Sequence, residues 1–208
     1  MAAETALSDR REPAVFRSIC VYCGSSPGRD PEFAGAAAEL GRLLADRRIT
    51  LVYGGGHVGL MGVLADATMA AGGEVYGVIT RALQRKEVAH TSLSRLEVTE
   101  SMHERKAAMA EASDGFIMLP GGLGTLEEFF EAATWTQLGI QSKPCGILNV
   151  KGYFDPLIAL LDRSTEQRFL REEHRNSIVV ESQVEALVDR LIAWTPLVVE
   201  KWLDLPEA

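Results

Sequence analysis

The sequence has little positive charge, and this limits the partners that the protein could bind. Lys and Arg number 21 against 29 Asp and Glu in 208 residues, so the formal net charge at pH 7 is −8. Nucleic acids and acidic membranes are bound by clustered basic residues, which a chain of this charge does not supply over a wide area. The composition therefore argues against both partners, although it is compatible with a local basic pocket.

Long hydrophobic runs are absent as well. No apolar stretch reaches the roughly 20 residues that span a bilayer, and residues 1–17 mix acids and arginines without the apolar centre of a signal peptide. We expect a disordered lead at 1–17, one domain at 18–195 and a C-terminal extension at 196–208. A cytoplasmic location is expected from the same absences.

Cysteine is scarce, and its pattern does not indicate a disulfide scaffold or a metal site. The chain has three cysteines, Cys20, Cys23 and Cys145, an odd number that fits a reducing compartment. Cys20 and Cys23 form a C-x-x-C, but a zinc site would need a second pair or histidines at ligand spacing, and the four histidines are scattered. A redox pair would stand at a helix start, whereas Cys20 lies in an expected strand. We interpret these cysteines as buried small residues and expect no metal.

Short apolar runs alternate with amphipathic segments along the chain. Expected strands lie at 18–22, 50–53, 74–79, 96–98, 115–119, 145–150 and 178–180. Expected helices lie at 31–46, 60–71, 101–112, 126–138, 155–161 and 184–194. Such alternation predicts an α/β fold with a doubly wound, mainly parallel sheet and helices on both faces. Residues 80–93 have no clear period and are expected to form a loop or short helix at the mouth of a site.

The turn 120–125 is the strongest candidate for a ligand site. Its three glycines let backbone amides approach a ligand, and the following helix directs unpaired N–H groups and its positive dipole end to the same point. An anion, most plausibly a phosphate, fits there, and Thr125 could cap the helix or bind a phosphate oxygen. An ordinary strand-to-helix turn is the alternative. Glu127 and Glu128 stand one turn away, beside the expected anion, which favours a role in chemistry.

Two other loops, 24–28 and 54–59, also leave the carboxyl ends of expected strands and should share one rim with 120–125. Gly54, Gly56 and Gly59 satisfy G-x-G-x-x-G, the dinucleotide fingerprint. However, the motif follows the second strand, and the next strand ends without the acid that would bind a ribose hydroxyl. A mononucleotide or sugar phosphate therefore suits these turns better than NAD or FAD.

Arg105 and Lys106 are adjacent basic residues near the start of the helix at 101–112. Two such charges are ordinarily a solvated pair. Their helix lies immediately before the phosphate turn, however, so at least one side chain could reach the same rim, where a guanidinium suits a phosphate or a polar base. Ser101 and Glu104 match a capping box, so Glu104 is a cap partner rather than a catalyst.

Four segments in order resemble a known family. Residues 120–128 (PGGLGTLEE) match the P-G-G-x-G-T-x-x-E signature of the LOG ("Lonely guy") family, the cytokinin riboside 5′-monophosphate phosphoribohydrolases. Residues 102–106 (MHERK) match its second motif, and 23–26 and 53–62 also look like family segments. The resemblance covers 19–194, and four ordered motifs are far more specific than one glycine turn.

The resemblance implies a Rossmann-like homodimer without a cofactor that acts on purine nucleoside 5′-monophosphates. Family members hydrolyse the N-glycosidic bond of cytokinin riboside 5′-monophosphates, and in bacteria of AMP, to free base and ribose 5-phosphate. Arg105 and Glu128 correspond to the proposed catalytic pair. The substrate-binding positions would be Ser25, Glu87, Arg105, Lys106, Gly121, Gly122, Gly124, Thr125, Glu127 and Thr134.

A carboxylate under the sugar would stabilise the oxocarbenium-like state and direct water, and either Glu128 or Glu127 could provide it. Arg105 could polarise the departing base or orient the carboxylate. Three other activities compete with hydrolysis. A molybdenum cofactor carrier would use the same turns without hydrolysis, and a nicotinamide-dependent oxidoreductase would bind NAD. Some family members are labelled lysine decarboxylases, but no lysine here lies in a recognisable pyridoxal phosphate motif.

Overall fold

A seven-stranded sheet organises the part of the chain that the structure, a computed structural model, describes: residues 16–85, 89–90 and 92–196. The strands are β1 (Ser18–Tyr22), β2 (Thr50–Tyr53), β3 (Val75–Thr80), β4 (Arg95–Thr99), β5 (Gly115–Met118), β6 (Cys145–Leu148) and β7 (Ile178–Glu181). The helices are α1 (Pro31–Asp46), α2 (Gly59–Ala70), α3 (Arg81–Gln84), α4 (Met102–Glu111), α5 (Leu123–Gln137), the short 3-10 helix η1 (Val150–Gly152), α6 (Asp155–Glu166), α7 (Glu172–Ser177) and α8 (Val184–Ile192).

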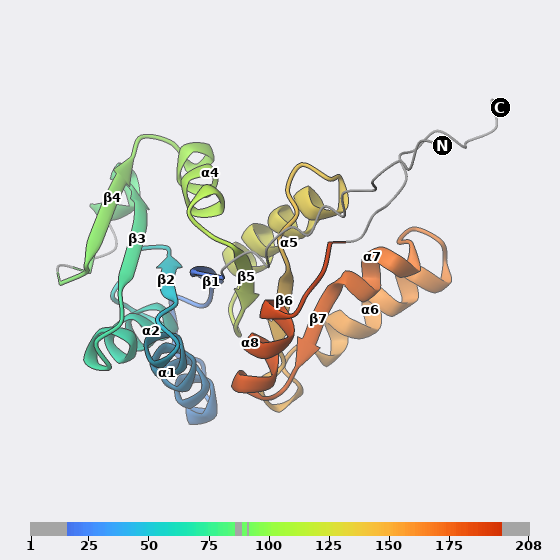
Figure 1. The fold of residues 1–208 in the computed structure, drawn as a ribbon, viewed down its shortest axis with the longest axis horizontal. Helices are drawn as coiled ribbons and strands as arrows, with labels where there is room; N and C mark the ends of the chain where they lie inside the picture. Colours follow the sequence, from blue (N-terminus) through green and yellow to red (C-terminus); the bar gives the residue numbers. More distant parts are fainter. Residues whose placement is uncertain (1–15, 86–88, 91, 197–208) are drawn as a thin grey trace, which may run out of the picture.

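All the strand pairs of this sheet are parallel, and their order is β4-β3-β2-β1-β5-β6-β7 (Figure 1). The strand order reverses between β1 and β5, and such a switch point leaves a crevice beyond the carboxyl ends of the two strands. The topology confirms the predicted α/β fold, a doubly wound, Rossmann-like parallel sheet in one domain. It also makes the loops after β1 and β5 the first place to look for a ligand.

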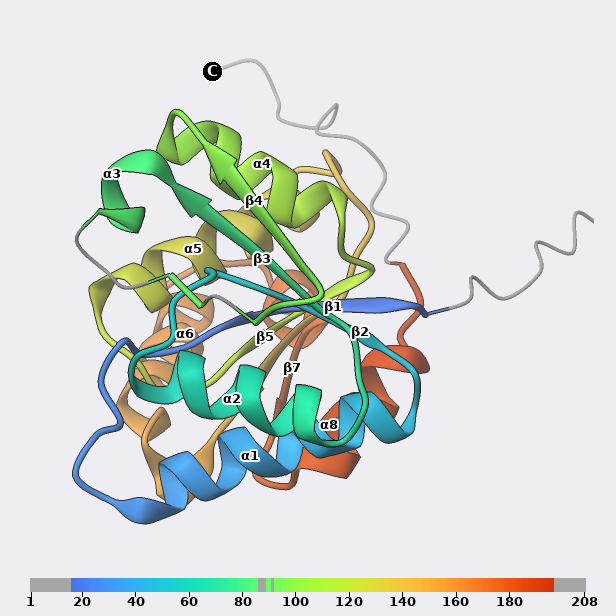
Figure 2. The ribbon, with the colours of Figure 1, turned by 90° about the vertical axis from the view of Figure 1, so that its left-hand side faces the viewer.

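Helices cover both faces of the sheet, as Figure 2 shows with α1, α2 and α8 on one side and α4 and α5 on the other. In β1, Ile19 and Val21 pack in the core under α1, α2 and α8, whereas Cys20 and Tyr22 pack in the core under α4, α5 and α6. Strands buried on both faces have no polar side to display, which is why β3, β5 and β6 are continuously apolar.

The three cysteines are free and buried, as expected from the sequence. Burial raises the pKa of the Cys20 and Cys23 thiols well above the ordinary value, and it raises the pKa of Cys145 to about 12. Thiols in this state are poor nucleophiles and poor metal ligands. Within the described ranges, none of the helices is both long enough and apolar enough to cross a membrane.

Several element boundaries differ from the sequence predictions. Helix α5 begins at Leu123 rather than 126, with Gly122 as an N-cap that has no side-chain hydrogen bond. Of the two roles expected for Thr125, capping is therefore excluded, and binding a phosphate oxygen stays a prediction. Helix α6 begins at Asp155, as predicted, but extends to Glu166 rather than 161. Helix α7 was not predicted, because six residues of polar sequence show no period.

The capping box at α4 is present in a modified form. The backbone N–H of Glu104 donates to Ser101 Oγ at 3.2 Å, but the Glu104 carboxylate accepts from the backbone N–H of Glu100, at 3.0 Å, rather than from Ser101. Glu104 is therefore a cap partner, as predicted. Most of the predicted lead and extension fall on residues 1–15 and 197–208, outside the described residues, so the domain limits stay a prediction.

Candidate active site

Three glycine-containing loops meet at the carboxyl edge of the sheet, as predicted. The backbone N–H of Gly24 donates to the Pro120 carbonyl at 3.0 Å, and the Gly24 carbonyl accepts from the backbone N–H of Leu60 at 3.0 Å. The loop after β1 is therefore bonded to the loops after β2 and β5. The approach is close enough that a side chain at Gly59 would collide with the backbone of Ser25.

Two hollows, each of about 330 Å³, lie on either side of this meeting point. The acid hollow is lined by Cys23, Gly24, Ser25, Met61, Leu83, Met102, Arg105, Gly122, Leu123, Gly124, Thr125, Glu127 and Glu128. The aromatic hollow is lined by Gly24, Ser25, Ser26, Pro27, Gly28, Phe33, Leu60, Pro120, Gly121, Gly122 and Tyr153. The two share Gly24, Ser25 and Gly122. Most of the predicted site residues thus gather around one crevice at the switch point.

The N-terminus of α5 opens into the acid hollow. The first backbone hydrogen bond of the helix runs from Leu126 N–H to the Gly122 carbonyl, so the N–H groups before Leu126 have no partner within the helix. No acidic side chain lies in the first turn to occupy this end. Thr125 is buried against Gly121, where a side chain would collide with it. The local geometry suits a bound anion.

Arg105 and Glu128 form a buried ion pair in the wall of the acid hollow. Arg105 Nη1 donates to Glu128 Oε1, and the two side chains are 7% and 14% exposed. Arg105 Nε also donates to the Val78 carbonyl at 2.9 Å. A side chain at Gly54 would collide with the guanidinium. The first glycine of the loop after β2 is therefore needed because the Arg105 guanidinium occupies the space of a side chain. This explanation does not require a bound dinucleotide.

The environment of Glu128 makes its carboxylate a stronger base than usual. Burial raises the pKa of Glu128, and the nearby Arg105 opposes this effect without cancelling it, so that the net pKa lies above the ordinary value. A carboxylate in this state accepts a proton more readily than an exposed one. Such a group can act as a general base.

Lys106 does not line the acid hollow and connects α4 to α5. Its Nζ lies 2.5 Å from Glu127 Oε1 and 3.0 Å from Glu131 Oε1, and the side chain is 9% exposed. Burial lowers the pKa of Lys106, but its hydrogen bonds to the two carboxylates outweigh this, and the net pKa is raised. Lys106 is thus a permanent cation that holds Glu127 at the rim. Its predicted contact with substrate stays a prediction.

Two predicted substrate contacts are not brought into the crevice by the described residues. Thr134 Oγ1 donates to the Phe130 carbonyl at 2.6 Å and lines a separate hollow of about 80 Å³ between α5, α6 and α7. Glu87 lies outside the described residues. Both roles stay predictions.

Sequence reasoning missed Tyr153, which follows β6 and reaches the same rim. Its hydroxyl donates to the Gly121 carbonyl at 2.7 Å, and its ring lines the aromatic hollow with Phe33. A usable signal was present, because the loops after all parallel strands lie at one edge of the sheet, and 151–154 follows the strand expected at 145–150. In the described part of the chain, no three His, Cys, Asp or Glu side chains gather as a metal site would require.

Comparison with known proteins gives one consistent group of relatives. A family model described as "possible lysine decarboxylase" matches residues 61–191. The chain is 46% identical over 181 residues to the cytokinin riboside 5′-monophosphate phosphoribohydrolase LOG of Oryza sativa subsp. japonica, covering 87% of this chain and 75% of that protein. A protein of the same description from Arabidopsis thaliana is 45% identical over 181 residues, covering 87% and 85%.

Solved structures with the same fold are more distant in sequence. A molybdenum cofactor binding protein from Rippkaea orientalis aligns with a TM-score of 0.64 at 22% identity, covering 86% of this chain and 96% of that one. The molybdenum cofactor carrier protein from Chlamydomonas reinhardtii aligns with a TM-score of 0.64 at 20% identity, covering 86% and 99%. At this identity the likeness shows a shared fold only.

Proposed function

Because the chain belongs to the LOG family of cytokinin riboside 5′-monophosphate phosphoribohydrolases, we propose that it hydrolyses the N-glycosidic bond of purine nucleoside 5′-monophosphates. The products are the free base and ribose 5-phosphate, and the substrates are cytokinin riboside 5′-monophosphates and AMP. The observation that carries this proposal is the buried Arg105–Glu128 pair, which lines the same hollow as the N-terminus of α5.

The 5′-phosphate binds at the N-terminus of α5, where the backbone N–H groups of Gly122, Gly124 and Thr125 are available to it. Because Gly121 has no side chain, Thr125 can pack directly against the turn. Binding energy gained at the phosphate, remote from the reacting carbon, holds the ribose in position beside Glu128.

In the chemical step, the bond between the anomeric carbon and the base nitrogen breaks, and water supplies the new oxygen on that carbon. Glu128 stabilises the positive charge that develops on the ribose and takes a proton from the attacking water, a role that its raised pKa favours. Arg105 holds Glu128 and polarises the departing base. The base takes up one proton from solvent and Glu128 releases to solvent the proton that it took from water, so the carboxylate is regenerated. Glu127 is paired with Lys106 and is 56% exposed, so we assign the chemistry to Glu128.

Two competing activities fit the site less well. A lysine that forms an imine must lose its proton, whereas the pKa of Lys106 is raised by its carboxylate partners. A carrier protein would need the anion site but not a buried arginine–glutamate pair beside it. We further propose that the protein is a cytoplasmic homodimer that binds neither nucleic acid nor membrane.

The test is an assay of the purified protein with AMP and with an N6-isopentenyl adenosine monophosphate, in which free base and ribose 5-phosphate are both measured. We expect both products from the wild type and a loss of turnover of at least about 100-fold in Glu128→Gln, with nucleotide binding largely kept. Glu166→Gln on the exposed face of α6 is the matched control and should be fully active. Tight nucleotide binding without product would favour a carrier, and full turnover in Glu128→Gln would remove this residue from the mechanism.

A further inference from the structure

The turn that is proposed to bind phosphate is held from outside by one side chain. Tyr153 Oη donates to the carbonyl of Gly121 at 2.7 Å, across 32 residues of sequence. Gly121 and Gly122 have no side chains of their own to fix their peptide groups. The Pro120 and Gly122 carbonyls accept backbone hydrogen bonds from Gly24 and Leu126, and the contact with Tyr153 restrains the Gly121 carbonyl between them.

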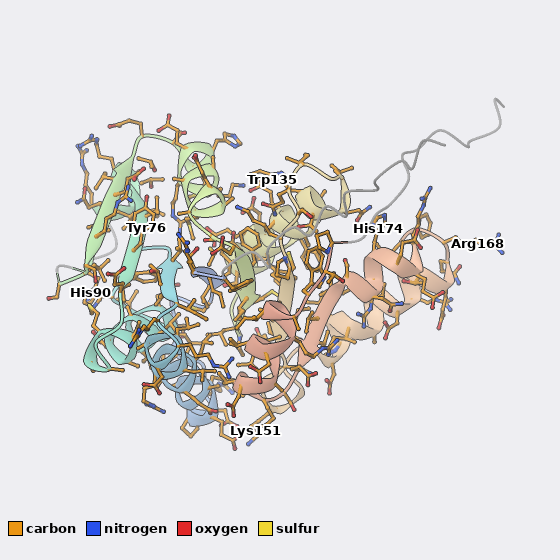
Figure 3. All side chains as sticks on the ribbon, viewed as in Figure 1. Tyr76, His90, Trp135, Lys151, Arg168 and His174 are labelled. Atoms are coloured by element: carbon orange, nitrogen blue, oxygen red, sulfur yellow. The ribbon has the colours of Figure 1, made fainter. Side chains whose placement is uncertain are left out.

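The loop that carries Tyr153 is itself held firmly. Asn149 Oδ1 accepts from the backbone N–H of Phe154 at 2.8 Å, and its Nδ2 donates to Asp155 at 2.7 Å. Lys151 adopts the left-handed conformation, with φ of 52°, which is unfavourable for a residue other than glycine. Its Nζ lies 3.0 Å from Asp30 and 2.9 Å from Glu32 at the start of α1. Figure 3 shows Lys151 at the edge of the molecule near α1.

Aromatic contacts fix the Tyr153 ring. Its centroid lies 5.6 Å from that of Phe33 and 4.8 Å from that of Phe154, both in edge-to-face arrangements. The hydroxyl therefore has little freedom to leave the Gly121 carbonyl. Backbone strain, two ion pairs and two ring contacts all serve to place this one hydroxyl.

The orientation of the Gly121 carbonyl decides the direction of the next N–H group. The Gly121 C=O and the Gly122 N–H belong to one planar peptide unit, and in a trans unit they point in opposite directions. With the carbonyl directed to Tyr153, the Gly122 N–H points away from it. If this peptide flipped, the carbonyl oxygen would replace the N–H and repel an anion.

We propose that Tyr153 is a positioning residue that locks the Gly121–Gly122 peptide with its N–H toward the substrate phosphate. This proposal rests on the proposed function only in the identity of the ligand, a phosphate ester held at the start of α5. Tyr153 acts through the backbone and does not itself contact the reacting atoms.

The test compares Tyr153→Phe with the wild type and with Tyr76→Phe. Tyr76 provides a matched control because its hydroxyl donates to Glu97 at 2.6 Å, and Figure 3 places it on the β3–β4 side of the molecule, far from Lys151. The measurements on the full-length protein are the Kd for ribose 5-phosphate by calorimetry, KM and kcat with AMP, the inhibition constant of adenosine, and Tm.

For Tyr153→Phe we expect Kd for ribose 5-phosphate and KM to rise about 2- to 10-fold, the effect of losing one neutral hydrogen bond. The kcat and the inhibition constant of adenosine, which has no phosphate, should stay unchanged, as should all values in Tyr76→Phe. An unchanged Kd for ribose 5-phosphate, or an equal loss of affinity for adenosine, would overturn the proposal.

The wild type separates this proposal from the proposed function. If the wild type binds ribose 5-phosphate but hydrolyses no nucleotide, the proposed function fails and the comparison of Tyr153→Phe with the wild type still stands. If the wild type binds no phosphate ester, both proposals fail.

Discussion

At the scale of single residues, the buried charge of Glu128 has the largest consequence. Burial costs this carboxylate more free energy than Arg105 returns, since the pKa is raised overall. A site that keeps a strong base out of water therefore does so at the expense of stability. Gln at this position would still accept a hydrogen bond from Arg105 but would carry no charge.

This cost should depend on pH with a definite sign. Because the pKa of Glu128 is higher in the folded protein than in the unfolded chain, where it is near 4.5, the folded state binds the proton more tightly. The free energy of unfolding therefore falls as pH rises from 4.5 through the folded pKa. We expect the difference in Tm between Glu128→Gln and the wild type to be larger at pH 7 than at pH 4. Each unit of pKa rise corresponds to about 1.4 kcal/mol, or about 3–6 °C in a chain of this size.

Calorimetric scans of both proteins at the two pH values measure this difference directly. Glu166→Gln is again the control, because it removes one carboxylate from an exposed position far from the site. A Tm difference for Glu128→Gln that stays constant or shrinks toward pH 7 would mean that the pKa of Glu128 is not raised.

At the scale of elements, the site is a junction between α4 and α5. Arg105 and Lys106 are neighbours on α4, and their partners, Glu128 on one side and Glu127 and Glu131 on the other, all lie on α5. The loop after β2 completes the junction, because Gly54 leaves the space that the Arg105 guanidinium fills.

Gly54→Ala should therefore separate activity from folding. The added methyl group meets the tip of a flexible side chain rather than backbone, so the backbone can keep its course, but displacing Arg105 from the buried Glu128 should cost about 3 kcal/mol of stability in a protein that still folds. Arg105 would have to leave its place between Val78 and Glu128, and we expect kcat/KM to fall at least about 10-fold. Circular dichroism melts and the product assay measure the two effects.

Gly35→Ala on α1 is the control for the extra methyl group, because open space surrounds that position. It should keep full activity. Full activity of Gly54→Ala would show that the Arg105 guanidinium does not need its present position. Binding of NAD to the wild type but not to Gly54→Ala would support the dinucleotide interpretation of the glycine motif.

The elements also show what sequence patterns can and cannot predict. Strands such as β5, buried on both faces, are visible as apolar runs, and α1 has the predicted bounds because Asp30 caps it and Pro31 begins it. The start of α5 was placed too late because Gly124 looks like a turn residue, yet it lies in the first helical turn. The partners of Lys106 and the contact of Tyr153 with Gly121 depend on packing between distant segments, which no local pattern encodes.

At the scale of the whole molecule, the order of the strands determines where the site lies. The carboxyl ends of β1 and β5 meet at the switch point, and the loops after β2 and β6 reach it from either side. Alternating strands and helices were enough to predict this rim. The assignment of Arg105 and Glu128 as the proposed catalytic pair came from family resemblance rather than from the topology.

We expect the protein to be a dimer in solution. The chain has a mass of 22.6 kDa, so two copies amount to 2 × 22.6, or 45.2 kDa. Light scattering coupled to size-exclusion chromatography measures this mass without reference to shape. A mass of 22.6 kDa at micromolar protein concentration would contradict the homodimer.

The crossover helix α4 has one further consequence. It leaves the outermost strand, β4, and returns over the sheet to β5 on the other side of the switch point. The cation at position 105 is thus contributed by the part of the chain from β1 to α4, and the acid at position 128 by the part that begins with β5. If the chain were divided between Ser113 and Asp114, one fragment would contain Arg105 and the other Glu128, each without its counter-ion. Hydrolysis should therefore return only when the two fragments are mixed and reassemble.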